Sequence, residues 1–373
     1  MIDRIEMYKV GFGDCFICSD KNNRYKMLID CGKFRGSLSA NIVQEINNSL
    51  SNSTNYLMVT HFHNDHFSGL KKLDKNLNFE RIYLPNFITE NILTLEFAML
   101  ANKSISGDEK YQTALNLITS IPTIARHFVR GTRISFLNRK YGIASKTTNG
   151  LDSFRILWPD MSYTEAYAKE LREVLKAEIT DDSYNILKEY ANKYIHLISS
   201  RSDNGIFYAS NGENNNQEDE TIMAFERLIE DFIRSVHLDL PERLLRKFSR
   251  IQNNISLCFD NVSSHNSSPV LFLSDIPKNE YKKIVKTTDL SDYYYAIKVP
   301  HHGTAKYFID NLPESRYLFI TNDNSHKKWK ICHKYFSNYA SRHIVTNLMC
   351  CDLQCARPRC CFPIGYDICY FNL

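Results

Sequence analysis

The feature that most constrains this chain is the segment THFHNDH at residues 60–66, in which four possible metal ligands occupy six positions: His61, His63, Asp65 and His66. They directly follow the apolar run NYLMVT, which is typical of a buried strand. At a strand end His61 and His63 can share a face, and a following turn lets Asp65 and His66 face a second ion. The spacing predicts a site for two metal ions about 3.5–4 Å apart, as in two-metal hydrolases.

The ligand types indicate which ions such a site would take. Imidazole and carboxylate suit Zn²⁺ and, with more oxygen donors, Mn²⁺. We therefore expect two divalent ions as cofactors, Zn²⁺ first and Mn²⁺ as the alternative. Two such ions lower the pKa of a bridging water toward about 7, which predicts hydrolysis with Asp65 accepting or orienting the proton of that water.

The pattern along the chain predicts a layered α/β domain. Residues 5–31 read as strand, turn and strands, residues 39–50 have helical spacing, and the run before His61 is a further strand. Nearly all of residues 160–250 has helical character, which predicts a helical insertion and a possible surface for a protein partner. Strand-like runs resume after residue 250.

Ordered sequence blocks then resemble the metallo-β-lactamase superfamily, and more narrowly the C-terminal hydrolase domain of ComEC-type DNA-uptake proteins. The blocks are VGFGDCFI at 10–17, MLIDCG at 27–32, THFHNDHFSGL at 60–70, NNIS at 253–256, LFLSD at 271–275 and VPHHGT at 299–304. The resemblance implies an αββα four-layer sandwich over residues 1–373, interrupted by the helical insertion at 160–250. It also implies a nuclease or other phosphodiesterase, with nucleic acid or a small phosphodiester as the substrate.

The resemblance also implies roles for single residues. Asp275 would bridge the two metals, and His301, His302 or both would complete the second site. Ser274 departs from the family's glycine, a change that we expect to alter only the turn.

Four residues are predicted to act on the substrate or to support the ligands. His302 and His326 are candidates to stabilise developing charge or to protonate the leaving oxygen, and a surface role is the alternative for His326. Asp14 and Asp30 are expected to orient histidines, because a metal-bound imidazole usually donates its other N–H to a carboxylate or carbonyl. No block supplies a third histidine for the first metal.

Other function classes remain open at this stage. A small-molecule esterase or phosphodiesterase, with the helical insertion as a lid, is one alternative, and an effector or scaffold subunit of a defence or regulatory complex is another. The formal net charge of +4 permits a phosphate-bearing substrate without demanding one. No apolar run reaches the length of a membrane span and no signal-peptide pattern begins the chain, so we expect a cytoplasmic protein without membrane contact.

Residues 348–373 form a cysteine-rich tail that ends in a strand-like run. Thiolates could close a structural zinc site there, although the spacing matches no pair of Cys-x-x-Cys units. Reduced thiols packed as small apolar residues are the alternative, and redox sensing is a third. The candidates in the tail are Cys350, Cys351, Cys355, Cys360 and Cys361.

Overall fold

The structure is a computed structural model that describes most of the 373 residues. The described ranges are 2–106, 112–128, 133–139, 154–200, 202–203, 206–208, 215–248, 250–262, 268–339, 341–347 and 368–373. The cysteine-rich loop, with the five cysteines proposed for a structural zinc, lies outside them. Cys369 alone of the tail cysteines is described, as a free thiol.

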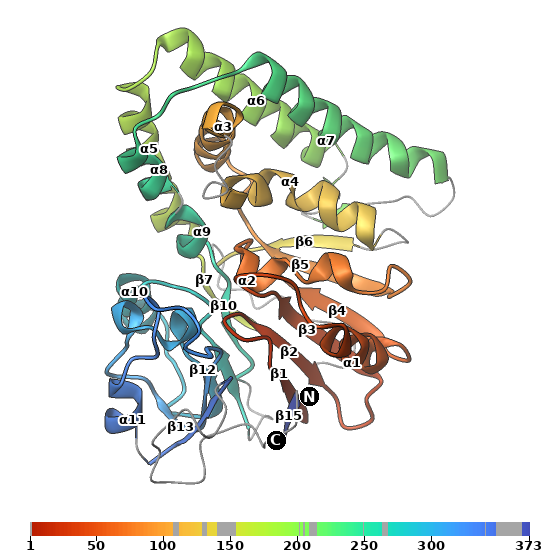
Figure 1. Cartoon of the computed structure of the whole chain (residues 1–373), viewed down its shortest axis with the longest axis vertical. Helices are drawn as coiled ribbons and strands as arrows, with labels where there is room; N and C mark the ends of the chain where they lie inside the picture. Colours follow the sequence, from red (N-terminus) through yellow and green to blue (C-terminus); the bar gives the residue numbers. More distant parts are fainter. Residues whose placement is uncertain are drawn as a thin grey trace.

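Two mixed sheets form the body of the molecule (Figure 1). Within the described residues the first has nine strands, in the order β15 (Ile368–Asn372), β1 (Arg4–Tyr8), β2 (Cys15–Ser19), β3 (Tyr25–Cys31), β4 (Thr54–Met58), β5 (Phe79–Pro85), β6 (Arg133–Leu137), β9 (Ile206–Tyr208) and β8 (Ser202–Asp203). The second has six, in the order β14 (His343–Thr346), β13 (Glu314–Ile320), β12 (Tyr293–Lys298), β11 (Val270–Phe272), β10 (Cys258–Asp260) and β7 (Arg155–Trp158). The expected α/β class is confirmed.

The helices form two groups, one made of the consecutive helices α3 to α9 and one made of the helices next to the strands. The first group consists of α3 (Glu90–Ser106), α4 (Gln112–His127), α5 (Met161–Lys176), α6 (Asp181–Ser199), α7 (Asn215–Ser235), α8 (Glu242–Phe248) and α9 (Arg250–Asn254). The others lie beside the strands: α1 (Ala40–Leu50), α2 (Asn64–Phe67), η1 (Leu70–Lys72), α10 (Lys278–Thr287), η3 (Pro300–Gly303), η4 (Ala305–Tyr307) and α11 (Lys334–Asn338). No helix among the described residues is long and apolar enough to cross a membrane.

The period-two pattern of the central strands explains their position between two apolar layers. In β3, Leu28 joins the cluster that contains the α1 residues Ile42 and Ile46, whereas its neighbours Met27 and Ile29 join a cluster shared with the second sheet. Successive side chains of a strand point to opposite faces, so one strand contributes to both clusters.

The buried face of α1 follows from its sequence. Ile42, Ile46 and Leu50 recur every four residues and are buried, and the Ser39 side chain caps the helix by accepting from the Ile42 amide at 3.3 Å. This helix therefore covers the face of the first sheet that the second sheet leaves free.

A third apolar cluster lies on the other side of the second sheet. It joins Leu271 and Ile297 of the strands to Tyr281 and Ile284 of α10 and to Tyr335 of α11. Each sheet thus has helices against one face and the other sheet against its second face.

The region 160–250, expected to be almost entirely helical, contains a short hairpin as well. Strands β8 and β9 pair with each other, and β9 continues the first sheet by antiparallel pairing with β6. The helices of this region share a buried cluster with α3, where Phe97 contacts Tyr190 of α6 and Phe232 of α7. The insertion therefore extends the first sheet's core instead of forming a core of its own.

The strand-like run expected after residue 250 begins later than the pattern suggested. Residues 250–254 form α9, and β10 begins only at Cys258. Trp158 explains the difference, because its Nε1 donates to the Asn254 carbonyl at 2.6 Å and holds the chain in a turn before the strand.

Candidate metal centre

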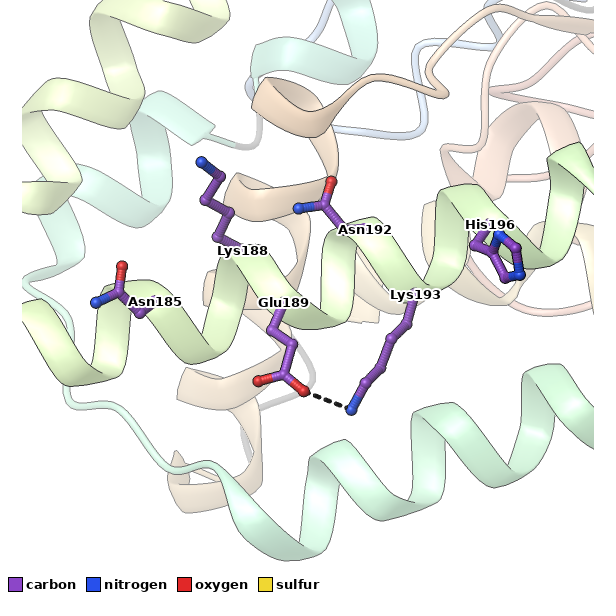
Figure 2. Close-up of a pocket in the computed structure, with 6 residues that line it drawn as sticks. All are labelled: Asn185, Lys188, Glu189, Asn192, Lys193 and His196. Atoms are coloured by element: carbon purple, nitrogen blue, oxygen red, sulfur yellow. Dashed lines mark ion pairs between the residues drawn. The ribbon is translucent and has the colours of Figure 1, made fainter.

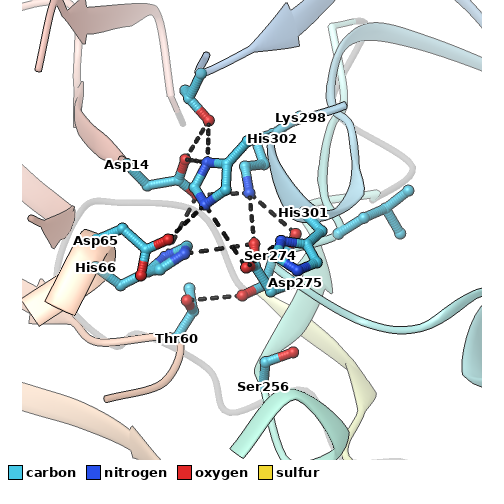
Figure 3. Close-up of polar contacts among 12 residues, drawn as sticks. Asp14, Thr60, Asp65, His66, Ser256, Ser274, Asp275, Lys298, His301 and His302 are labelled. Atoms are coloured by element: carbon cyan, nitrogen blue, oxygen red, sulfur yellow. Dashed lines mark hydrogen bonds and ion pairs between the residues drawn. The ribbon is translucent and has the colours of Figure 1, made fainter. Parts of the chain in front are cut away.

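Loops at the strand ends of both sheets meet at one buried point (Figure 3). The first sheet supplies His61 and His63 after β4, then Asp65 and His66 on α2. The second sheet supplies Asp275 after β11, with His301 and His302 on η3 after β12 as the remaining members. All of the predicted ligands therefore lie together, although they span positions 61 to 302.

Three histidines are held in the same way. The Nδ1 of His66 lies 2.8 Å from Asp30 Oδ2, that of His302 lies 3.0 Å from Thr321 Oγ1, and that of His61 lies 3.2 Å from Thr60 Oγ1. In these three rings Nδ1, here called the outer nitrogen, faces away from the centre of the site, and Nε2, the inner nitrogen, faces toward it. A histidine whose outer nitrogen is bound in this manner has a fixed tautomer and ring orientation.

The inner nitrogens of the same three rings face Asp275. The distances from Nε2 to the nearer Asp275 oxygen are 3.4 Å for His66, 3.6 Å for His302 and 3.8 Å for His61. His301 approaches the same carboxylate, with Nδ1 at 3.0 Å from Oδ2. The fully buried Asp275 is the centre of the constellation.

Two overlapping groups of side chains could each hold an ion. One consists of His61, His63 and Asp275, and the other of Asp14, His66, Asp275 and His302. Within each group the candidate ligand atoms lie within 4.8 Å of one another. Asp65 belongs beside the second group, since its Oδ2 is 3.0 Å from His302 Nε2.

Asp14 contacts two of the histidines and one of their neighbours. Its carboxylate contacts His302 Nδ1 at 3.3 Å and His66 Nδ1 at 3.5 Å, and it also accepts from the Thr321 hydroxyl. Since these contacts are to the outer nitrogens, Asp14 orients two histidines at once in this arrangement.

The histidines of the two groups differ in their pKa values: those of His61 and His63 are lowered, and that of His302 is raised. Burial, together with the neighbouring His66 and His63, lowers the pKa of His61 well below its ordinary value, and burial lowers the pKa of His63 to about 4. Both rings are neutral at pH 7 and offer a lone pair. Burial acts in the same sense on His302, but Asp275 and Asp14 outweigh it and raise the pKa of that ring to about 9.

The buried carboxylates of the site lie among positive charges. Four buried carboxyl groups (Asp14, Asp30, Asp65, Asp275) surround one buried ammonium, that of Lys298, which lies 2.5 Å from Asp14 Oδ2 and 3.4 Å from Asp275 Oδ1. Burial opposes ionisation of Asp275, yet His302, His301, His66 and Lys298 together hold its pKa well below its ordinary value. Lys298 and the protonated ring of His302 therefore balance part of the carboxylate charge, and a bound metal ion would take the place of such a ring proton.

These observations fit divalent metal ions. His66 Nε2, His301 Nδ1 and Asp275 Oδ2 are buried and have no hydrogen-bond partner among the described residues. Unpaired buried polar atoms are costly, and here they converge with neutral imidazoles and carboxylates, the donor set of zinc and manganese sites. Metal ligation would satisfy these atoms and balance the carboxylates.

Comparison of the chain with protein-family models and with curated proteins found no match.

Close backbone approaches hold the ligand loop in place. A Cβ at Gly32 would lie 2.3 Å from the His66 amide nitrogen, so only glycine lets this turn pack against α2. The two histidines of η3 have left-handed φ values, 45° for His301 and 54° for His302. Non-glycine residues rarely adopt this conformation, and it occurs preferentially at functional sites.

Ser274 links the two ligand loops. Its φ is 41°, which is in the left-handed region, and its hydroxyl donates to Thr60 Oγ1 at 2.7 Å. That bond connects the loop after β11 to the loop after β4.

His326 lies on an aromatic surface next to the site. Its ring stacks on Trp329 at 4.2 Å and contacts Phe34 at 5.4 Å, while Phe12 connects this group to His302 at 4.3 Å. Aromatic rings thus separate His326 from the ligands.

The histidines of the helical region stay outside the site. His196 is exposed on α6, in a shallow groove that also includes Lys193 and Glu189, an ion pair at 2.7 Å (Figure 2). His237, after α7, is exposed too.

Sequence reasoning missed Lys298 and Tyr307. Lys298 is the one charged residue in the middle of the otherwise apolar run AIKVP, an unusual position that could have marked it. The Tyr307 ring lies 3.9 Å from that of His301, a contact that no spacing in the sequence reveals.

Proposed function

We propose that this chain is a metal-dependent hydrolase of the metallo-β-lactamase fold that cleaves phosphodiester bonds, with DNA or RNA as its substrate. One observation carries the proposal: three buried histidines have their outer nitrogens bound and their inner nitrogens turned toward Asp275. The helix, sheet, sheet, helix order of the apolar clusters supports the αββα sandwich.

In this proposal the ligands divide between two divalent ions. His61 and His63 would hold one ion, and Asp65, His66 and His302 would hold the other with His301 beside them. Asp275, which belongs to both groups, would contribute to both sites. When bound, such ions supply Lewis-acid polarisation of a phosphoryl oxygen and a lowered pKa of water.

The chain's own residues supply the remaining chemistry. Burial opposes ionisation of Asp65, but its hydrogen bond with His302 and the nearby His66 lower the pKa of its carboxyl group. The carboxylate therefore stays ionised at neutral pH and can accept the proton of the attacking water. Asp30 and Asp14 keep His66 and His302 oriented through their Nδ1 atoms.

The surface around His326 supports a nucleic-acid substrate. Phe34 and Trp329 contact each other at 4.7 Å, and the half-buried Lys33 and the exposed Arg35, Lys328 and Lys330 surround this pair. Aromatic rings among cations are the arrangement with which proteins hold single strands, through base stacking and phosphate contacts. His326 is placed to contact substrate here instead of transferring a proton at the metals.

A small-molecule phosphodiesterase is the second candidate, and a pocket of about 460 Å³ favours it. This pocket adjoins Tyr307, next to His301, and α5 and α9 of the helical region form part of its wall. Both candidates use the same metal centre and differ in the size of the substrate.

The test is cleavage by protein reconstituted with Zn²⁺ or Mn²⁺. Labelled single- and double-stranded DNA, RNA and bis(p-nitrophenyl) phosphate would be offered to the wild type, Asp275→Ala and the control Asp289→Ala, which changes an exposed carboxylate after α10. We expect two metal equivalents and cleavage for the wild type and the control, and loss of both for Asp275→Ala. Equal activity in all three proteins would refute the assigned centre.

A further inference from the structure

The pocket beside Tyr307 combines aromatic and cationic side chains. Its aromatic walls are Trp158, Tyr163, Tyr167 and Tyr307, and it lies where α5, α9, α10 and η4 meet. A volume of about 460 Å³ is within the range that holds a small organic ligand.

The charge of the pocket is strongly one-sided. Arg250, Lys278, Lys283 and Lys306 line it, and Glu280 is the one carboxylate among the lining residues. Lys283 Nζ lies 3.9 Å from Glu280 Oε1 and Lys278 Nζ lies 3.4 Å from Asp310 Oδ1, so Arg250 and Lys306 provide the excess of positive charge. Because the whole chain has a net charge of only +4, this local excess points to an anionic ligand.

One aromatic side chain is available for stacking. Tyr163 is 42% exposed, although its ring also stacks on Trp158 at 6.3 Å. Lys283 Nζ lies 4.5 Å from the centre of the same ring. A planar aromatic group and a phosphate could therefore be held at adjacent positions.

A buried polar atom gives a second, independent indication of a ligand. Asn253 lines the pocket and is 7% exposed, and its Oδ1 has no hydrogen-bond partner among the described residues. Its Nδ2 donates to the Tyr307 hydroxyl at 3.5 Å, which leaves the oxygen available to a ligand. The edge of a nucleobase carries N–H donors that would satisfy this acceptor.

We propose that this pocket binds a nucleoside phosphate, and that it holds the nucleotide next to the bond cleaved at the metal centre. The stacking and hydrogen-bonding groups take the base, and the cations take phosphate. Tyr307 connects the two sites, because its ring packs on His301 at 3.9 Å while its hydroxyl meets Asn253. The second half of this inference rests on the proposed phosphodiesterase function, whereas binding by the pocket does not.

The experiment measures binding by calorimetry on the chelator-treated full chain, so that hydrolysis plays no part. The probes are adenosine monophosphate, ribose 5-phosphate, inorganic phosphate and a five-nucleotide DNA strand. The variants are Lys283→Ala and Tyr163→Ala. The matched control is Lys286→Ala, which removes the same charge from an exposed position on α10 outside the pocket.

We expect adenosine monophosphate to bind at least about tenfold more tightly than ribose 5-phosphate, because stacking adds affinity. Lys283→Ala and Tyr163→Ala should each weaken that binding about tenfold and Lys286→Ala should not. Tighter binding of the DNA strand with the same variant dependence would assign the nucleotide to a strand, and tighter binding of the monophosphate would assign it to a free nucleotide. Either result supports the pocket.

Equal affinity for the nucleotide and for inorganic phosphate, or an equal loss in Lys286→Ala and Lys283→Ala, would overturn the pocket. Cleavage of bis(p-nitrophenyl) phosphate by the metal-loaded wild type would then still support the proposed function. Nucleotide binding without any metal-dependent hydrolysis would instead retain the pocket and reject the phosphodiesterase.

Discussion

Asp30 shows how much the candidate metal centre depends on residues outside its two ligand groups. It accepts from the Thr60 amide and the Thr60 hydroxyl, both at 2.7 Å, and from His66 Nδ1 at 2.8 Å. Its φ is 54°, a conformation that asparagine tolerates well. One carboxylate thus fixes the end of β4 and the orientation of His66.

Asp30→Asn should lower metal affinity about 10–100-fold while the fold persists, because the amide keeps the shape but cannot accept all three hydrogen bonds. Competition with a chelator, followed by the metal content of the protein, measures the affinity. Asp20→Asn is the control, since Asp20 accepts from the Tyr25 amide at 2.8 Å in a turn away from the site. Unchanged affinity in Asp30→Asn would show that Asp30 does not orient His66.

The sequence predicts single residues of the site well where they share a short segment. His61, His63, Asp65 and His66 could be found from spacing, and Asp275, His301 and His302 from the resemblance of two further blocks. The resemblance placed His301 and His302 at the site without deciding between them. The structure gives both a contact with Asp275, because the left-handed turn of η3 directs both rings toward it.

At the scale of elements, α3 contains a buried carboxyl group that the chemistry does not use. Glu96 is fully buried, and neither of its carboxylate oxygens has a hydrogen-bond partner among the described residues. Burial raises its pKa well above the ordinary value of 4.5. The folded protein therefore keeps a proton at pH values at which the unfolded chain has released it.

This difference makes stability fall as pH rises. Below pH 4.5 both states hold the proton, and above it the folded state loses about 1.4 kcal/mol per pH unit up to its own raised pKa. Glu96→Gln carries no such proton, so its stability advantage over the wild type should grow from pH 5 to pH 7. Denaturant unfolding measures this advantage, with the exposed Glu170→Gln on α5 as control. An advantage independent of pH would contradict the assignment.

Most helices and strands lie where the spacing of apolar residues predicts them, and the exceptions have identifiable causes. The three-residue strand β9 belongs to the first sheet because β6 offers it an edge, which local sequence does not encode. The α9 turn depends on Trp158, nearly a hundred positions away. Long-range pairing of this kind decides structure where the local pattern is short.

At the scale of the whole molecule, the metal centre joins the two sheets. The ligands after β4 come from the first sheet and those after β11 and β12 from the second. A ligand that binds the folded state alone stabilises it by about 2.7 kcal/mol when its free concentration is 100 times the dissociation constant.

Removing metal should therefore lower the unfolding temperature of the wild type, and returning Zn²⁺ should restore it. Asp275→Ala should show little or no such shift, because it removes the carboxylate common to both groups. Thermal unfolding by circular dichroism, with and without chelator, measures the effect. An equal response in both proteins would place the metal elsewhere.

Among the described residues of α3 to α9, none belongs to the two ligand groups, yet α5 and α9 form part of the pocket wall. Under the proposed function, the groups that react and part of the wall that recognises the substrate would come from different parts of the chain. Exposed positions of the helices that face the pocket could then change, and with them the substrate, while the reaction stayed the same.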